Sequence, residues 1–288
     1  MDLSIIIINW NVRDLLKKCL ISIYQYIQNI DFELFVVDNA SKDGSLAMIQ
    51  KEFPQVRLIA NQKNTGFAYA NNQALKQAAG QNILLLNPDT ELADNSMEKI
   101  VRLFNQHNDW AVVGCKILNF GGALQKSVRR FPSLKDQLLI QLKLQHLPFF
   151  KKNLNSYLAQ DFNYGKESEV DQVMGAFFLT KKSVIEKIGG FDAKYYLWFE
   201  EVDFCKRAKD IGLKVIYTPA IKIYHHGAES FKQLNWRKQL IWDHSVQHYF
   251  WTHQPKWQWL VLWFFQPISL LLAVIIDYWE KINAKKLF

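Results

Sequence analysis

The stretch "LSIIIINW" (Leu3–Trp10) is a nearly continuous apolar run that is rich in isoleucine. A run of this kind predicts a strand that is buried on both faces of a sheet. Similar runs, separated by helical stretches, follow at residues 32–38, 56–61, 82–87 and 111–118. Strands that alternate with helices predict an α/β fold with a mostly parallel central sheet that is flanked by helices.

Polar residues stand at the ends of three of these predicted strands. They are Asn9 and Asn11 at the first, Asp38 at the second, and Asn87 and Asp89 at the fourth. The carboxyl ends of parallel strands meet at one edge of the sheet, and α/β proteins bind their ligands there. We therefore predict a ligand site at this edge rather than three unrelated polar turns.

The composition is that of a globular protein, with 49% hydrophobic and 22% charged residues and a formal net charge of +8. The positive charge indicates an anionic partner, such as a phosphorylated ligand or a membrane surface. A nucleic-acid partner is disfavoured because the charge is dispersed and no recognition motif occurs. The three cysteines are far apart without a CxxC spacing, which favours buried thiols in a reducing, cytoplasmic compartment over a zinc site or disulfides.

The turn after the first predicted strand, "NWNVRD", contains no glycine. This excludes the GxGxxG loop of dinucleotide-binding dehydrogenases, and the sequence also lacks a Walker loop. A nucleotidyltransferase would also be expected to carry a glycine-rich loop near its start. If the chain binds phosphates, another group must neutralise them, and a divalent metal held by Asp89 would do so.

Several motifs together resemble those of the family 2 glycosyltransferases. In order, they are "SIIIINWN", "VVDNASKDGS", "NTGFAYANNQAL", "LLLNPDTEL", "GGFD", "YLWFEEVDFCKRAKDIG" and "IYHHGAES". The resemblance covers roughly Leu3 to Ser230 and is greatest to the rhamnosyltransferase-like enzymes of bacterial cell-surface polysaccharides. It implies a GT-A fold, a dTDP- or UDP-sugar donor, a Mg²⁺ or Mn²⁺ cofactor, and inversion at the anomeric carbon. It also implies a glycan or a polyprenyl-linked acceptor.

The resemblance assigns the strand-end residues and one helix to the nucleotide-sugar site. Asp38 matches the residue that contacts the nucleotide, and a carboxylate there can accept a hydrogen bond from the base or the ribose. The residues implied to bind the donor are Asn9, Asn11, Asp38, Asn64, Gly66, Asn71 and Asn87. For Asn71, a buried and satisfied amide is an equal alternative.

The resemblance also implies a metal site built from Asp89 and His225. The family commonly has an Asp-x-Asp motif where this chain has Asn87-Pro88-Asp89, so Asp89 alone carries the charge of the motif. Asn87 can still bind a ribose hydroxyl. Neutral histidine is a common metal ligand, and His225 fits the family position better than His226.

Glu200, Glu201 and Asp203 stand at a predicted helix start and are the candidate catalytic residues. The resemblance implies that the second member of the pair, Glu201, is the general base, and that Asp203 orients the acceptor or caps the helix. A single base suffices when the acceptor hydroxyl displaces the nucleotide directly. The alternative is that these acids only complement the helix dipole.

We expect a GT-A domain over residues 1–235, with a nucleotide-binding half over about 1–115 and an acceptor-binding half over about 116–235. Residues 236–288 form an aromatic-rich helical extension. Its stretch at 256–281 is strongly apolar, and its middle is interrupted by Gln266-Pro267. We expect two segments that lie on the inner face of the cell membrane, with two helices packed on the catalytic domain as the alternative.

The sequence therefore predicts a metal-assisted inverting glycosyltransferase of cell-surface polysaccharide synthesis, with rhamnose as the sugar that the subgroup suggests. Two other functions stay open. One is a catalytically degenerate sugar-nucleotide-binding or scaffold protein, which Asn87 would favour. The other is a nucleotidyltransferase, which the missing glycine-rich loop and the Glu200-Glu201 pair disfavour.

Overall fold

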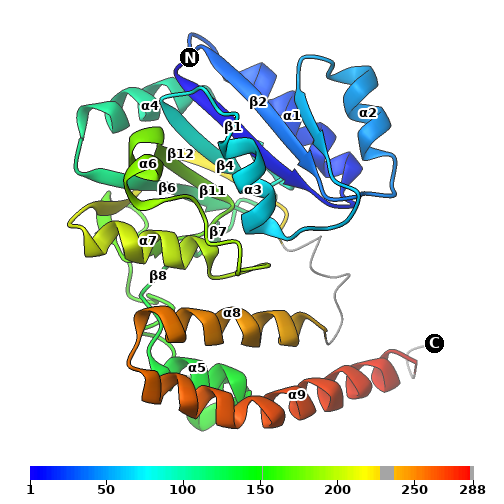
Figure 1. Ribbon diagram of the computed structural model, residues 1–288, viewed down its shortest axis with the longest axis vertical. Helices are drawn as coiled ribbons and strands as arrows, with labels where there is room; N and C mark the ends of the chain where they lie inside the picture. Colours follow the sequence, from blue (N-terminus) through cyan, green and yellow to red (C-terminus); the bar gives the residue numbers. More distant parts are fainter. Residues whose placement is uncertain (151, 228–236, 286–288) are drawn as a thin grey trace.

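The first apolar run forms strand β1 (Leu3–Asn9), and all seven of its residues are buried. The computed structural model describes residues 1–150, 152–227 and 237–285 (Figure 1). Strand β1 lies between β2 (Phe32–Asp38) and β4 (Asn82–Leu86), with β3 (Arg57–Ala60) beyond β2, and all of these strands pair in parallel. Alternate side chains of β1 enter the two hydrophobic cores on opposite faces of the sheet.

Beyond β4 the sheet is mixed. Strand β11 (Phe177–Lys181) lies antiparallel between β4 and β6 (Trp110–Leu118), so β6 does not pair with β4. Because β11 is antiparallel to both neighbours, β6 runs in the same direction as β4, so all five predicted strands share one direction, but only β3, β2, β1 and β4 pair directly with one another. The reason is that a distant strand, which follows a long excursion of the chain, pairs with β4 in place of the next strand along the sequence.

The remaining strands complete this second half of the sheet. Strand β12 (Lys214–His225) pairs in parallel with β6 and antiparallel with β5 (Thr90–Leu92). Two short strands extend this half: β7 (Leu124–Gln125) pairs with β6, and β9 (Ser168–Val170) pairs with β12. Strands β8 (Val128–Arg129) and β10 (Gln172–Val173) form a separate two-stranded sheet.

Helices cover both faces of the sheet. One face carries α1 (Arg13–Tyr26), α2 (Ser45–Glu52) and α4 (Met97–Gln106), and the other carries α3 (Phe67–Leu75), α6 (Lys182–Ile188) and α7 (Glu200–Asp210). Helix α4 is an example of the amphipathic pattern by which such helices pack on the sheet. Its buried residues are spaced three and four apart and so lie on one face. These residues are Met97, Ile100, Val101 and Phe104.

A further layer of helices lies beyond α7 (Figure 1). It consists of α8 (Arg237–His253), α9 (Lys256–Lys285) and α5 (Leu134–Gln141), and the short 3₁₀ turns η1 (Leu144–His146) and η2 (Pro148–Phe150) follow α5. The amide of Gln141 in α5 donates to the carbonyl of Leu262 in α9 over 3.1 Å. The expected domain boundary at residue 235 lies outside the described residues.

Helix α9 corrects the prediction that Gln266-Pro267 divides the C-terminal stretch. The helix is continuous over 30 residues, with Pro267 inside it. Proline removes one backbone hydrogen bond from a helix interior, but fully buried residues on both sides of it, Leu262 and Ser269, hold the helix in place. Pro267 itself lies on the exposed side of the helix.

Candidate active site

Polar side chains at the ends of β1 and β2 form one hydrogen-bonded group. The Asn9 amide donates to Asp38 Oδ1 over 2.7 Å, and the backbone N–H of Ser41 donates to Asp38 Oδ2 over 2.8 Å. Ser41 Oγ in turn accepts from the backbone N–H of Asn11 over 2.9 Å. The strand-end residues thus meet at one edge, as the sequence predicts, and they also fix the loop that precedes α2.

The segment that contains Asn64, Gly66 and Asn71 packs against the chain just before α7. Gly66 has φ +84°, and a Cβ at this position would lie 2.5 Å from the carbonyl oxygen of Tyr196. Only glycine permits this approach. Gly66 therefore allows the backbone before α3 to pack closely against the backbone at Tyr196. Asn64 accepts from the N–H of Gly66, and the fully buried Asn71 donates to the carbonyl of Phe67.

Asp89 and His225 lie together, at the end of β4 and the end of β12. Asp89 Oδ1 is 3.3 Å from His225 Nε2, and both side chains are 7% exposed. Among the described residues, His225 Nε2 has no hydrogen-bond partner, while His225 Nδ1 lies 2.9 Å from Gln125 Oε1. Gln125 therefore holds Nδ1 as the protonated nitrogen and leaves the Nε2 lone pair directed toward the carboxylate.

Two lone-pair donors that face each other in a buried place are suited to hold a cation. Within the described part of the chain, no group of three or more His, Cys, Asp or Glu side chains gathers as a metal site. The pair fits a hard divalent ion that takes its other ligands from a diphosphate, as Mg²⁺ commonly does. His226 does not join them, because it stacks on Phe120 with ring centroids 3.8 Å apart.

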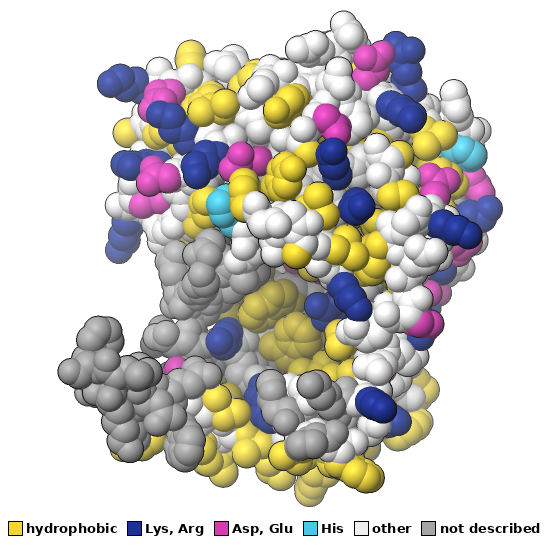
Figure 2. Space-filling view, turned by 180° about the vertical axis from the view of Figure 1, so that it is seen from behind, with side chains coloured by type: hydrophobic (Ala, Val, Ile, Leu, Met, Phe, Trp, Pro, Cys, Tyr) yellow, Lys and Arg dark blue, Asp and Glu magenta, His cyan; other side chains and the backbone are white. Residues whose placement is uncertain are grey.

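A pocket of about 380 Å³ brings the catalytic candidates together. Glu200 and Glu201, from the start of α7, line it with Asn87 and His225. Figure 2 shows the molecule hollowed between the sheet domain and the helical layer, with hydrophobic side chains in the hollow. These four residues come from separate motifs of the sequence, and they line one pocket.

The two glutamates differ in their surroundings. Burial, and then the charge of Glu201, raise the pKa of Glu200 well above its usual range. Burial also raises the pKa of Glu201, but the nearby guanidinium of Arg129 acts in the opposite direction. One carboxyl oxygen of each, Oε2, is buried without a hydrogen-bond partner among the described residues. Glu201 is therefore the member of the pair that is more readily ionised, as a general base must be.

We predict that Arg129→Met shifts the acid limb of the pH–rate profile to higher pH. Without the guanidinium, the pKa of Glu201 rises further, and a carboxyl group loses its function as a base when the pH falls below its pKa. Profiles of kcat/KM against pH measure the shift. Arg130→Met is the matched control, because Arg130 is exposed and pairs with Asp161. An acid limb that is unchanged in Arg129→Met would contradict the assignment of Glu201 as the base whose pKa Arg129 lowers.

Asp203, the third acid of the predicted catalytic group, does not line the pocket. Its Oδ2 accepts from Arg207 Nε over 2.8 Å, and its Oδ1 lies 2.7 Å from His253 Nε2 in α8. With only 2% of its surface exposed, Asp203 has both oxygens engaged. The structure thus gives it the role of a buried link between α7 and α8 in place of contact with the acceptor.

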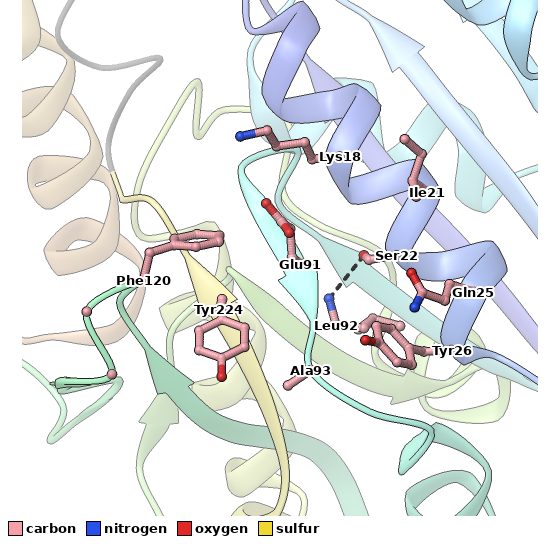
Figure 3. Close-up of a pocket in the computed structure, with 12 residues that line it drawn as sticks. Lys18, Ile21, Ser22, Gln25, Tyr26, Glu91, Leu92, Ala93, Phe120 and Tyr224 are labelled. Carbon is pink, nitrogen blue, oxygen red and sulfur yellow. Dashed lines mark hydrogen bonds between the residues drawn. The ribbon is translucent and has the colours of Figure 1, made fainter.

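A second, larger pocket of about 580 Å³ lies between α1, β5 and the turn after β6 (Figure 3). Glu91 is the only carboxylate among its lining residues, and Lys18, Gln25 and Tyr26 line it from α1. Although it is larger, we place the chemistry in the smaller pocket. Only that pocket contains the pair of buried carboxyl groups and the histidine with a free lone pair.

Sequence reasoning missed four pocket residues that have a direct effect on the site. Arg129 tunes Glu201, Gln125 orients His225, and Trp198 and Trp242 form part of an aromatic wall. Arg129 stands in the basic "RRFPS" stretch, whose charge was the only signal. Gln125 and Trp242 carry no local signal, because tertiary packing alone brings them to the pocket.

Comparisons with known proteins agree with this geometry. Residues 4–189 match the protein family described as Glycosyl transferase family 2. The N-acetylglucosaminyl-diphospho-decaprenol L-rhamnosyltransferase of Mycobacterium tuberculosis is 26% identical over 211 residues, which cover 68% of this chain and 67% of the relative. The rhamnosyltransferase WbbL of Escherichia coli K12 is 26% identical over 184 residues, which cover 59% of this chain and 66% of the relative.

Solved structures resemble the fold. The mannosyltransferase PcManGT of Pyrobaculum calidifontis, in complex with GDP-Man and Mn²⁺, has a TM-score of 0.57 at 16% identity and covers 99% of this chain and 79% of its own. GalNAc-T7, with UDP, GalNAc and Mn²⁺, has a TM-score of 0.57 at 14% identity and covers 78% of this chain and 44% of its own. The expected GT-A fold is confirmed by these neighbours.

The fold and the site define a glycosyltransferase of the GT-A type that acts in glycan synthesis. The chain belongs to glycosyl transferase family 2. This membership decides between the two enzyme classes that the sequence left open, in favour of glycosyl transfer over nucleotidyl transfer.

Proposed function

We propose that the protein transfers rhamnose from a dTDP-sugar, or another sugar from a UDP-sugar, to a lipid-linked glycan acceptor with inversion of configuration. The names of the mycobacterial and Escherichia coli relatives support rhamnose, and the name of the former supports a diphospho-polyprenol acceptor. The observation that carries the proposal is Glu201 Oε2, which is buried without a hydrogen-bond partner among the described residues and belongs to the same pocket as His225. Cell-surface polysaccharide synthesis is the process that such an acceptor serves.

In the proposed reaction, Glu201 Oε2 accepts the proton of the acceptor hydroxyl as its oxygen attacks the anomeric carbon. The bond from that carbon to the diphosphate breaks, and the electron pair leaves with the nucleoside diphosphate. A new glycosidic bond forms on the opposite face of the sugar, which inverts the configuration. Burial raises the pKa of Glu200, which favours its protonated form, and in that form it would donate a hydrogen bond to a hydroxyl group in the pocket.

Asp89 and His225 would hold a Mg²⁺ or Mn²⁺ ion beside the leaving group, and the ion would neutralise the charge that develops on the diphosphate. The structural neighbours that contain Mn²⁺ support this cofactor. We propose that the nucleotide binds along the edge formed by Asn9, Asn11 and Asp38. Asn64, Gly66, Asn71 and Asn87 would lie beside the donor.

A screen of donor nucleotides tests the proposed donor class. We expect one nucleotide class, dTDP or UDP, to raise the melting temperature by several degrees in the presence of Mn²⁺ and by much less in EDTA. GDP-mannose and ADP-glucose serve as mismatched donors. Equal stabilisation by all four, or no dependence on the metal, would contradict the donor and metal assignments.

We further propose that the protein binds the inner face of the cell membrane through α9. Over Lys256–Tyr278 this helix is long and apolar enough to cross a membrane. Only 11% of the residues in its apolar 18-residue window are buried in the protein, so most of this apolar surface is exposed. Most of its exposed apolar residues recur at intervals of three and four, which places them on one face. They are Trp257, Leu260, Phe264, Ile268, Leu271, Ile275 and Tyr278, and Trp263, Val274 and Ile276 are exposed as well.

The opposite face of α9 favours a helix that lies in the membrane surface over one that spans it. The fully buried Ser269 lies within hydrogen-bond distance of Asp243 on α8, and Gln141 on α5 donates to α9. A spanning orientation would take these polar partners into hydrocarbon, which is costly. Phe149, 86% exposed in the same helical layer, extends the apolar surface.

We predict that Phe264→Glu with Leu271→Glu lowers binding to anionic phospholipid vesicles by about tenfold or more, because two exposed apolar side chains are lost to the interface. Flotation of the protein with vesicles measures this. The matched control replaces Ile21 and Tyr69, which are 47% and 48% exposed on other helices, with glutamate. Equal binding of both variants and of the unaltered protein would rule out α9 as the contact surface.

A further inference from the structure

Helix α8 reaches into the active-site pocket although it lies outside the residues that match the family. Residues 4–189 match, and α8 begins at Arg237. Its residue Trp242 lines the same pocket as Glu201, together with Trp198. The helical extension thus contributes to the wall of the site as well as to the surface proposed to bind the membrane.

Three polar contacts fix α8 against the catalytic domain. His248 Nε2 lies 2.6 Å from Asp192 Oδ2, and His253 Nε2 lies 2.7 Å from Asp203 Oδ1. Before both histidines on α8, Ser245 Oγ donates to the carbonyl oxygen of Leu197 over 2.9 Å. The position of Trp242 is therefore set by contacts along the whole helix, and it does not depend on the indole ring alone.

The segment opposite Trp242 is strained. Trp198 and Phe199 have φ values of +67° and +71°, which are uncommon for bulky residues. Such strain persists only where the surroundings enforce it, and it concentrates at functional sites. Here Trp242 packs against both rings, with centroids 5.6 Å from Trp198 and 5.2 Å from Phe199. The strained pair leads directly into α7, which begins at Glu200.

The pocket is lined by side chains of two kinds. Glu200, Glu201, Arg129 and His225 are charged or polar, while a second group consists of large apolar side chains. These are Phe67, Met174, Leu197, Trp198, Phe199 and Trp242. A pyranose ring suits such a pocket, because its C–H face packs on an aromatic ring while its hydroxyl groups bond to polar groups.

We propose that Trp198 and Trp242 form the platform for the sugar ring of the acceptor and present its hydroxyl to Glu201. This inference rests on the proposed function and specifies which part of the chain recognises the acceptor. Because Trp242 is part of α8, acceptor recognition would depend on a helix that lies beyond the family-matched residues 4–189. Trp242 is a specificity-determining residue, and His248, Ser245 and His253 act through it as positioning residues.

The test is a kinetic comparison of Trp242→Ala, Trp242→Phe and Trp198→Ala, with dTDP-rhamnose as donor and N-acetylglucosaminyl-diphospho-farnesol as a short acceptor in detergent. We expect each alanine variant to raise the KM for the acceptor about tenfold, with kcat within about threefold. The KM for the donor, and donor hydrolysis without acceptor, should stay unchanged. Trp242→Phe should restore most of the acceptor affinity. Trp251→Ala, an exposed tryptophan on the same helix, is the control.

Each outcome decides a separate question. An unchanged acceptor KM in both alanine variants, or a loss of kcat and donor affinity together, would overturn the platform. A fall in melting temperature that Trp242→Phe does not relieve, with unaltered acceptor KM, would show a purely structural role and also overturn it. If the unaltered protein stabilises with nucleotide but transfers nothing to this acceptor, the proposed function fails before the platform is tested.

Discussion

Glu201→Gln is expected to lower the rate of sugar transfer by about 10²–10⁴-fold and to leave donor affinity unchanged. Glutamine keeps the size of the side chain but cannot accept the proton of the acceptor hydroxyl. The buried Oε2 of Glu201 has no hydrogen-bond partner among the described residues, so the substitution breaks no hydrogen bond of that oxygen. Single-turnover kinetics and titration with nucleotide separate the two effects.

Two neighbouring acids give matched controls for this prediction. Glu200→Gln should lower the rate less, because burial raises the pKa of Glu200 and so favours the protonated form, whose ability to donate a hydrogen bond glutamine keeps. Asp203→Asn should lower the melting temperature more than it lowers the rate, since Asp203 is bound to Arg207 and His253. If Glu201→Gln keeps near-full turnover and Glu200→Gln does not, the base is Glu200.

Asp89→Ala is expected to abolish metal-dependent binding of the nucleoside diphosphate while the fold stays intact. Asp89 supplies the only carboxylate of the Asn87-Pro88-Asp89 motif, and no glycine-rich loop is present to hold the phosphates. His225 alone would bind a hard cation weakly, because Mg²⁺ and Mn²⁺ prefer oxygen ligands. Calorimetric titration with nucleoside diphosphate and Mn²⁺ measures the loss.

Glu91→Ala is the matched control, because Glu91 stands two residues further on, in β5, and lines the other pocket. Gln125→Leu should give an intermediate loss, since Gln125 orients the His225 ring. Full metal-dependent affinity in Asp89→Ala, with circular dichroism unchanged, would remove Asp89 from the site.

Local patterns in the sequence were enough to predict the first half of the fold. The apolar runs that become β1, β2, β3 and β4 each fall where the sequence places them. For β1, β2 and β4 the reason is that a strand buried on both faces has a nearly continuous apolar composition. Strand β11 could not be placed in this way. Its pairing with β4 joins residues about 95 positions apart, as in Phe178 with Leu85, and no local pattern specifies such a contact.

The site was predictable where its residues belong to motifs and unpredictable where packing alone decides. Asn87, His225, Glu200 and Glu201 were found from their motifs, and the structure brings them together. Asp203 was misjudged because its partner His253 lies 50 residues away on α8. Pro267 indicated a break in α9, but burial on both sides of it outweighs one lost hydrogen bond.

The most direct test of the account is a product analysis with dTDP-rhamnose, N-acetylglucosaminyl-diphospho-farnesol and Mn²⁺. The account predicts that dTDP is released in equal amount to the rhamnose transferred, and that nuclear magnetic resonance shows the new bond in the anomeric configuration opposite to that of the donor. Release of pyrophosphate, a retained configuration, or loss of donor without any glycosylated acceptor would contradict it.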